Sequence, residues 1–200
     1  MKATKGSVME PTEGISKAGT TVKAGIVSSL RGIDEIEAEI VSLARNTVSN
    51  ALGATGTVAN EGVAIAKDVV RGTIQATEEV GTGLVLSTKS VAKGIVMGVS
   101  DVGGDVVTAA GQTVKSAVKG AAEVGADVAL VARRAVDGVV EAAKEVGGNV
   151  MEVAESAVGG AVTAAGEIGN TAVKAVKETL IGVVEGVKEI GGAVLPRSRE

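Results

Sequence analysis

The sequence predicts an all-α protein built from a long amphipathic helix that packs side by side with other helices. A branched apolar residue recurs every 22 residues, at Ile36, Val58, Val80, Val102, Val124, Val146, Ile168 and Ile190. Prolines occur only at positions 11 and 196, at the two ends of the periodic region, and proline is costly inside a helix. Repetition at a fixed spacing indicates one small structural unit that is used many times.

Each 22-residue unit contains two successive 11-residue patterns. In the unit from Val124 to Glu145, apolar or small residues fall at positions 1, 2, 5, 6, 8 and 9 and again at 12, 13, 16, 17, 19 and 20. Eleven residues in three turns is about 3.67 residues per turn, which predicts a near-straight to right-handed packing of α-helices. These positions cover an arc of about 165° on a helical wheel, which is broader than the seam of a two-stranded coiled coil.

The repeat divides the chain into an N-terminal tail (1–13), a repeat region (14–195) and a C-terminal tail (196–200). The units of the repeat region start at residues 14, 36, 58, 80, 102, 124, 146, 168 and 190. A continuous helix over 14–195 would be about 270 Å long, and a helical hairpin hinged near 50–56 is the alternative. Gly103-Gly104 and Gly147-Gly148 keep the phase of the repeat, so we interpret them as packing positions first and hinges second.

Positions 15 and 19 of the units hold small residues. From the third unit onward these are Gly72, Ala76, Gly94, Gly98, Ser116, Gly120, Gly138, Ala142, Gly160, Ala164, Gly182 and Gly186. Small residues four apart let two helix backbones approach closely. We therefore expect this row to be a helix-packing surface, beside the apolar row at position 1.

Charged residues lie on both borders of the apolar face. Position 10 carries Lys23, Arg45, Lys67, Lys89, Arg133 and Lys177, and position 22 carries Glu35, Glu79, Asp101, Glu123, Glu145, Glu167 and Glu189. Opposite charges on the two borders predict electrostatic pairing between neighbouring helices.

An isolated helix of this composition should not be stable, because Val, Thr and Gly are weak helix formers. The helix must then be held by a surface that covers its apolar face. Six core positions in eleven imply that each helix contacts more than one neighbour. We expect an oligomeric coiled coil, an α-helical barrel or a filament.

The 11-residue pattern resembles that of hendecad coiled-coil proteins. The composition is also similar to the 11- and 22-residue amphipathic repeats of synucleins and exchangeable apolipoproteins, in the segments Val146-Gly147-Gly148, Val176-Lys177-Glu178-Thr179 and Ile190-Gly191-Gly192-Ala193-Val194. The second resemblance implies helices that lie on lipid surfaces. Neither resemblance supplies functional residues.

The composition argues against chemistry. The chain has no His, Cys or aromatic residue, so the commonest catalytic bases and metal ligands are missing. The acidic cluster of Glu141, Glu145 and Glu152 is better interpreted as a solvated face than as a metal site. A balance of 20 basic and 24 acidic residues gives no excess for nucleic acid. We expect no enzyme activity, no catalytic residue, no cofactor and no metal.

The function we expect is that of a structural protein. It self-assembles through its Val/Ala/Gly face into a helical oligomer, tube or filament, with an apolar interior able to hold lipid-like molecules. The alternative is a peripheral amphipathic-helix protein that coats a membrane, lipid droplet or granule. No signal peptide or conventional transmembrane helix is apparent, which predicts a cytoplasmic protein, free or associated with a membrane or granule.

Overall fold

The computed structural model describes residues 19–26, 36–55, 58–80 and 83–194. Residues 19–26 are helical. Seven further helices follow in the described part of the chain: α2 (Ile36–Thr55), α3 (Val58–Val80), α4 (Leu84–Asp101), α5 (Val106–Glu123), α6 (Val128–Glu145), α7 (Val150–Ile168) and α8 (Asn170–Val194). No strand occurs in these residues. The prediction of an all-α protein is confirmed.

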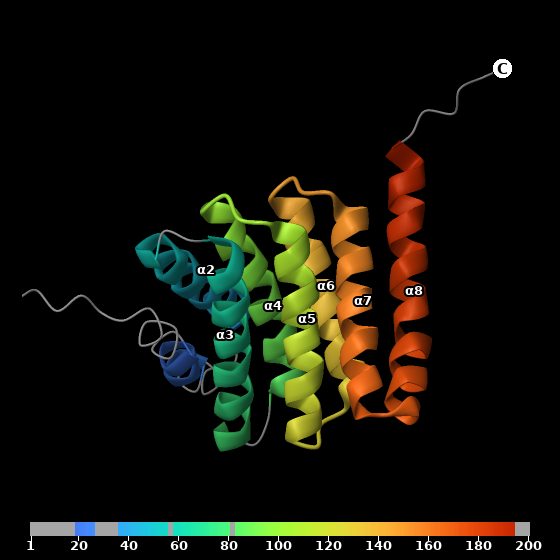
Figure 1. Ribbon diagram of the computed structural model, residues 1–200, viewed down its shortest axis with the longest axis horizontal. Coiled ribbons are helices and arrows are strands. Elements are labelled where there is room, and N and C mark those ends of the chain that lie inside the picture. The colour runs from blue at the N-terminus through green and yellow to red at the C-terminus, as the bar shows by residue number, and fades with distance from the viewer. Residues whose placement is uncertain (1–18, 27–35, 56–57, 81–82, 195–200) are drawn as a thin grey trace, which may run out of the picture.

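The helices form two layers (Figure 1). From α2 onward, each helix packs against the next helix in the chain and against the one after it. Helices α2, α4, α6 and α8 therefore lie side by side in one layer, and α3, α5 and α7 lie side by side in the other. The segment 19–26 packs on α3, where Gly19 meets Asp68, and on α2, where Gly25 meets Leu43. Helix α8 is at the C-terminal edge of the array.

The expectation of one continuous helix, or of a hairpin hinged near 50–56, is wrong, and so is that of a barrel. Helix α2 does end at Thr55, inside the expected hinge, but the chain also turns once in each following repeat up to α8. The units that begin at residues 36 and 58 coincide with the starts of α2 and α3. A 22-residue unit is therefore one helix and one turn, and two units make a helical hairpin.

Three turns share a helix-ending motif built on glycine. Val102, Val124 and Val146 end α4, α5 and α6, and the next residues, Gly103, Gly125 and Gly147, have φ of +70°, +69° and +71°. The amide of the following residue donates back to a carbonyl of the last helical turn, for example Gly104 to Val99 at 2.9 Å. This is a Schellman arrangement, in which glycine takes the left-handed conformation without strain.

Two residues after each of these glycines, a polar side chain caps the N-terminus of the next helix. Asp105 accepts hydrogen bonds from the amides of Val107 (3.0 Å) and Thr108 (3.1 Å). Asp127 and Asn149 cap α6 and α7 in the same way. Such caps satisfy amides that have no partner within the helix. The glycine and the cap together explain why the chain turns without proline.

The core is aliphatic and lies between the layers. Its largest fully buried side chains include Ile26, Ile40, Leu52, Ile65, Ile95 and Leu180. Valine and alanine fill the rest, and Val114, Val136 and Ala164 are fully buried. The broad apolar face of each inner helix is divided between its neighbours in the same layer and the opposite layer. The chain thus covers much of its own apolar surface.

Within the described residues, the helices are too short or too polar to qualify as membrane-spanning segments.

Candidate interaction surface

Glycines of the small-residue row lie against the backbone of the neighbouring helix in the same layer. A Cβ atom at Gly94 of α4 would lie 2.5 Å from the carbonyl oxygen of Val41, and one at Gly98 would lie 2.6 Å from that of Arg45. Gly138 of α6 meets the Lys89 carbonyl of α4 in the same manner, and Gly160 of α7 meets the Gly111 carbonyl of α5. These distances leave no room for a side chain, so glycine sets the spacing between the helices.

The other members of the row differ in their surroundings. Gly72 meets the backbone of Gly19, and Gly120 meets the side chain of Ile74. Ala76, Ala142 and Ala164 are fully buried, whereas Ser116 is half-buried. Gly182 and Gly186 of α8 have nothing within 4 Å of a Cβ position. The last helix therefore carries the packing residues of the row without the close contact seen in α4, α6 and α7.

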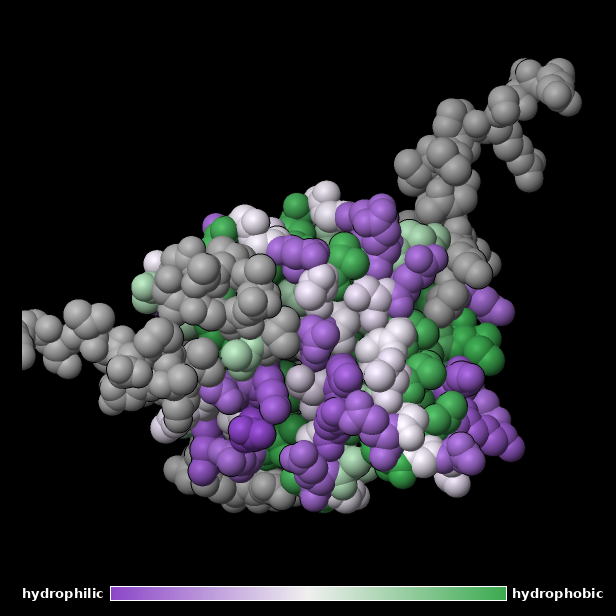
Figure 2. Space-filling model, viewed as in Figure 1, coloured by the Kyte–Doolittle hydropathy of each residue, from purple (hydrophilic) through white to green (hydrophobic). Residues whose placement is uncertain are grey.

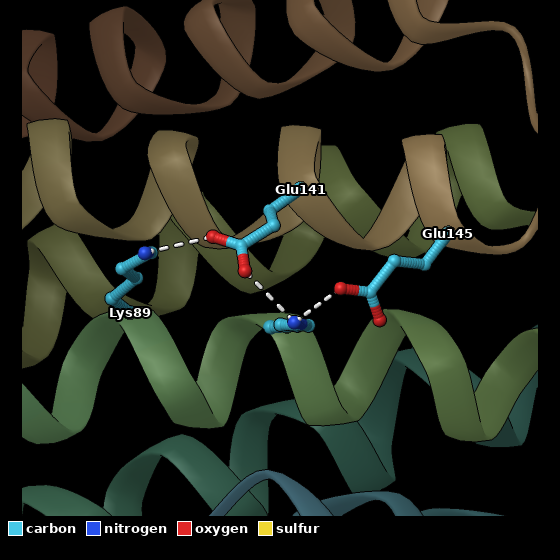
Figure 3. Close-up of polar contacts among 4 residues, drawn as sticks. Lys89, Glu141 and Glu145 are labelled. Carbon is cyan, nitrogen blue, oxygen red and sulfur yellow. Dashed lines mark hydrogen bonds and ion pairs between the residues drawn. The ribbon is translucent and has the colours of Figure 1, made fainter. Parts of the chain in front are cut away.

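Ion pairs join helices of the same layer beside these glycines. Lys89 and Lys93 project from α4 toward Glu141 and Glu145 of α6 (Figure 3). The Lys89 ammonium lies 2.7 Å from Glu141, and the Lys93 ammonium lies 2.8 Å from Glu141 and 2.5 Å from Glu145. Glu141 and Glu145, which the sequence suggested as members of an acidic cluster, thus hold lysines.

Two other helix pairs have comparable contacts. The Arg45 guanidinium of α2 donates two hydrogen bonds of 2.6 Å to the Asp101 carboxylate of α4. Lys115 of α5 lies 3.4 Å from Glu167 of α7, and Lys119 contacts the same carboxylate. In each case the basic residue belongs to the earlier helix and the acidic residue to the later one.

The pairs perturb the protonation of their members. The hydrogen bonds from Arg45 lower the pKa of Asp101, and those from Lys89 and Lys93 lower the pKa of Glu141. Burial alone would lower the pKa of Lys93, but the hydrogen bonds to Glu141 and Glu145 together with their negative charges outweigh it and raise the pKa. All of these groups are therefore held in their charged forms.

Apart from Ile190, the residues of the apolar row at position 1 lie at helix ends. Ile36 and Val58 are the first residues of α2 and α3, and Val80 and Ile168 are the last residues of α3 and α7. Val102, Val124 and Val146 are half-buried residues that end their helices. Ile190 lies within α8, but its side chain is outside the described residues. The row marks the turns rather than the middle of a helix face.

Several border charges lie away from the ion pairs described above. Lys67 and Glu123 line a groove of about 360 Å³ between α3 and α5. Lys23 lies on the helical segment 19–26, and Lys177 is exposed on α8. Glu35 lies outside the described residues, and so do the side chains of Glu79 and Glu189.

The space between α6 and α8 is open. A groove of about 470 Å³ is lined there by Arg133, Arg134, Asp137, Gly182 and Gly186, among other residues. Burial raises the pKa of Asp137, with the nearby arginines acting in the opposite direction. Helix α8 thus lies beside α6 without the glycine-to-backbone contact that joins α6 to α4.

The outer surface of α8 combines charge with an exposed apolar side chain. Ile181 is 56% exposed, more than the two other exposed large hydrophobic residues found in the described part, Leu130 and Ile168. Lys177 and Glu185 lie four residues to either side of it and are also exposed. In Figure 2, hydrophobic residues gather at the edge where Figure 1 places α8, with hydrophilic residues beside them.

Sequence reasoning missed the residues that shape these surfaces. It overlooked Lys93, Lys115, Lys119 and Glu141 as pairing residues, because it followed only positions 10 and 22. It also missed the capping role of Asp105, Asp127 and Asn149, although each follows a glycine by two residues in three successive repeats. In the described part of the chain, no group of His, Cys, Asp and Glu residues is arranged to hold a metal ion.

Comparisons with known proteins bear on the fold. No family model matches the chain, and no curated protein matches it. A solved structure, that of the de novo designed helical repeat protein DHR7, is similar with a TM-score of 0.51 and 22% identity, over 88% of this chain and 95% of that one. At this identity the likeness shows the fold alone. The chain is an array of tandem helical hairpins of the helical repeat type.

Proposed function

We propose that this protein is a non-enzymatic helical repeat protein that self-assembles through the edge of its array. The observation that supports the proposal is the state of α8. It exposes Ile181 on its outer surface, and its small residues Gly182 and Gly186, which line the groove toward α6, have nothing within 4 Å of a Cβ position. Contacts between neighbouring repeats contribute to the stability of such arrays, so an edge helix with an uncovered apolar residue favours a further partner.

The sequence alone predicted a partner along the whole chain, whereas we place the partner at one edge of the helix array. The apolar residues of the inner helices are covered by other helices of the same chain; Val114 and Val153, for example, are fully buried. An assembly of folded arrays needs no contact with those residues. This supports an oligomer or filament of compact units rather than a tube of single long helices.

The lipid-coating alternative requires a larger change in structure. Helices that lie on a membrane bury their apolar faces in lipid, whereas here those faces pack against each other. Coating would therefore separate the two layers and expose the core. Circular dichroism distinguishes the alternatives: self-assembly predicts strong helicity in plain buffer, and coating by separated helices predicts helicity that depends on vesicles.

The oligomeric state tests the proposal directly. We expect sedimentation equilibrium to give a mass above the 19.6 kDa of one chain, with the mass rising as the protein concentration rises. Concentrations up to roughly 100 μM populate assemblies whose Kd is micromolar. A helical protein that remains a monomer over that range would refute self-assembly.

A further inference from the structure

The exposed stripe on α8 has an arrangement of charge that suits a second copy of itself. The stripe consists of Lys174, Lys177, Glu178, Ile181 and Glu185, all of which are exposed. Residues spaced by three or four lie on one side of a helix, so the five side chains share a face. Lys174 and Glu178 form a distant pair of 4.0 Å within the helix.

One pair of opposite charges in the stripe lies symmetrically around Ile181. Lys177 precedes it by four residues and Glu185 follows it by four. Consider two α8 helices that cross antiparallel, with a two-fold axis at Ile181. A residue that precedes position 181 in one copy then faces the residue that follows position 181 by the same number of residues in the other copy. Lys177 of one copy then faces Glu185 of the other, and the symmetry creates this contact twice.

From this symmetry we infer that two copies dock by their α8 stripes, antiparallel and with Ile181 against Ile181. The inference rests on the proposed function and specifies its interface. Such a contact is isologous, so it closes on itself and yields a dimer rather than a filament.

The size of the stripe indicates a weak dimer. From Lys174 to Glu185 the helix rises about 17 Å, so the contact buries less than the roughly 800 Å² per partner of a standard stable interface. Its affinity then depends strongly on the apolar contact at the centre and on the two flanking ion pairs. Changes at these three residues should have large effects on association and little effect on folding, since the side chains are exposed.

Charge reversal tests the antiparallel geometry. Lys177→Glu places a glutamate against Glu185 in both contacts, and Glu185→Lys places a lysine against Lys177, so each variant alone should be monomeric. When the two variants are mixed, every contact pairs a lysine with a glutamate. We expect sedimentation velocity to show that the mixture recovers the dimer, and that the double variant Lys177→Glu/Glu185→Lys also dimerises.

Two further variants complete the test. Ile181→Glu should weaken dimerisation by at least about tenfold, as expected for a central interface residue. Arg71→Glu, a charge reversal on the exposed surface of α3, should leave the dimer unchanged. Circular dichroism of each variant verifies that the array remains folded.

The outcomes separate the inference from the proposed function. A wild-type dimer whose charge-reversal variants are monomeric alone and dimeric when mixed supports both. An oligomer or filament that is insensitive to Lys177, Ile181 and Glu185 leaves self-assembly standing and overturns the α8 interface. A wild-type monomer at all concentrations overturns both.

Discussion

Single glycines of this chain have opposite roles at the same place in the repeat. Gly138 and Gly182 both occupy position 15 of their units. Gly138 lies against the Lys89 carbonyl, whereas Gly182 has nothing within 4 Å of a Cβ position. The repeat treats the two residues alike, and only the neighbouring helix distinguishes them.

This difference predicts that one substitution changes stability in opposite directions at the two sites. Gly138→Ala should lower the free energy of unfolding by about 1–3 kcal/mol, because the new methyl group forces α4 and α6 apart. Gly182→Ala should raise it by about 1 kcal/mol, because alanine has the higher helix propensity and finds open space. Urea unfolding followed by circular dichroism measures both. Changes of the same sign would contradict the packing described for α6 and α8.

The sequence predicted where small residues are required but not which helix they contact. Positions 15 and 19 are small in each unit from the one that starts at residue 58 to the one that starts at residue 168, and glycines at these positions in α4, α6 and α7 contact a neighbour in the same layer. The contact partner of Gly94 is α2, two helices back along the chain, at Val41 and Arg45. A periodic pattern has no means of separating a contact two helices away from a contact with another molecule.

At the scale of the element, the turn determines the architecture. The motif consists of valine at the helix end, glycine with positive φ and a capping Asp or Asn, and it appears at Gly103, Gly125 and Gly147. The helices α4, α5 and α6 are each 18 residues long. The four residues that complete the 22-residue unit are enough to reverse the chain, so antiparallel neighbours follow at each repeat.

The continuous-helix prediction failed because of a coincidence of lengths. Twenty-two residues correspond to six turns at about 3.67 residues per turn, so the apolar pattern keeps its phase across each turn as if the helix continued. Glycine pairs in phase with the repeat then resemble packing residues. The distinguishing signal was the acid or amide two residues after the glycine, Asp105 and Asp127 among them, which is typical of a helix start.

The cap at Asp105 gives a prediction with a pH dependence. Asp105→Ala should lower the free energy of unfolding by about 1 kcal/mol, because the amides of Val107 and Thr108 lose their acceptor. Asp105→Asn keeps an acceptor and serves as the control. Hydrogen bonds from the Thr108 hydroxyl and the two amides lower the pKa of Asp105.

The sign of the pH effect follows from that lowered pKa. A carboxylate whose pKa is lower in the folded state than in the unfolded state stabilises the protein at pH values above its unfolded pKa, which is about 3.9. That contribution is lost as the pH falls through the folded-state pKa. Chemical denaturation between about pH 6 and about pH 3 should therefore show a steeper loss of stability for the wild type than for Asp105→Asn. Parallel curves would indicate that the cap does not depend on the charge.

On the scale of the whole molecule, stability should be distributed unevenly along the array. Each helix contacts only near neighbours, so inner helices have partners on both sides and edge helices on one. The sequence predicted that another surface must cover the apolar face of each helix. It did not reveal that the same chain supplies it, because burial against a neighbouring repeat and burial against another copy leave the same pattern of apolar residues.

Hydrogen exchange of the native protein measures this distribution. Amides of α4, α5 and α6 should exchange slowest, because these helices lie between others in the array and each is held by ion pairs and by a close glycine contact to a helix of its own layer. Amides of α8 should exchange faster, because the groove beside α6 leaves it fewer close contacts. Dimerisation through the α8 stripe adds protection to that helix alone. Ile181→Glu should then speed exchange in α8 and leave exchange in α4 to α6 unchanged. Uniform protection of the wild type from α4 to α8 would contradict both the open α6–α8 groove and an array held together by contacts between neighbouring helices.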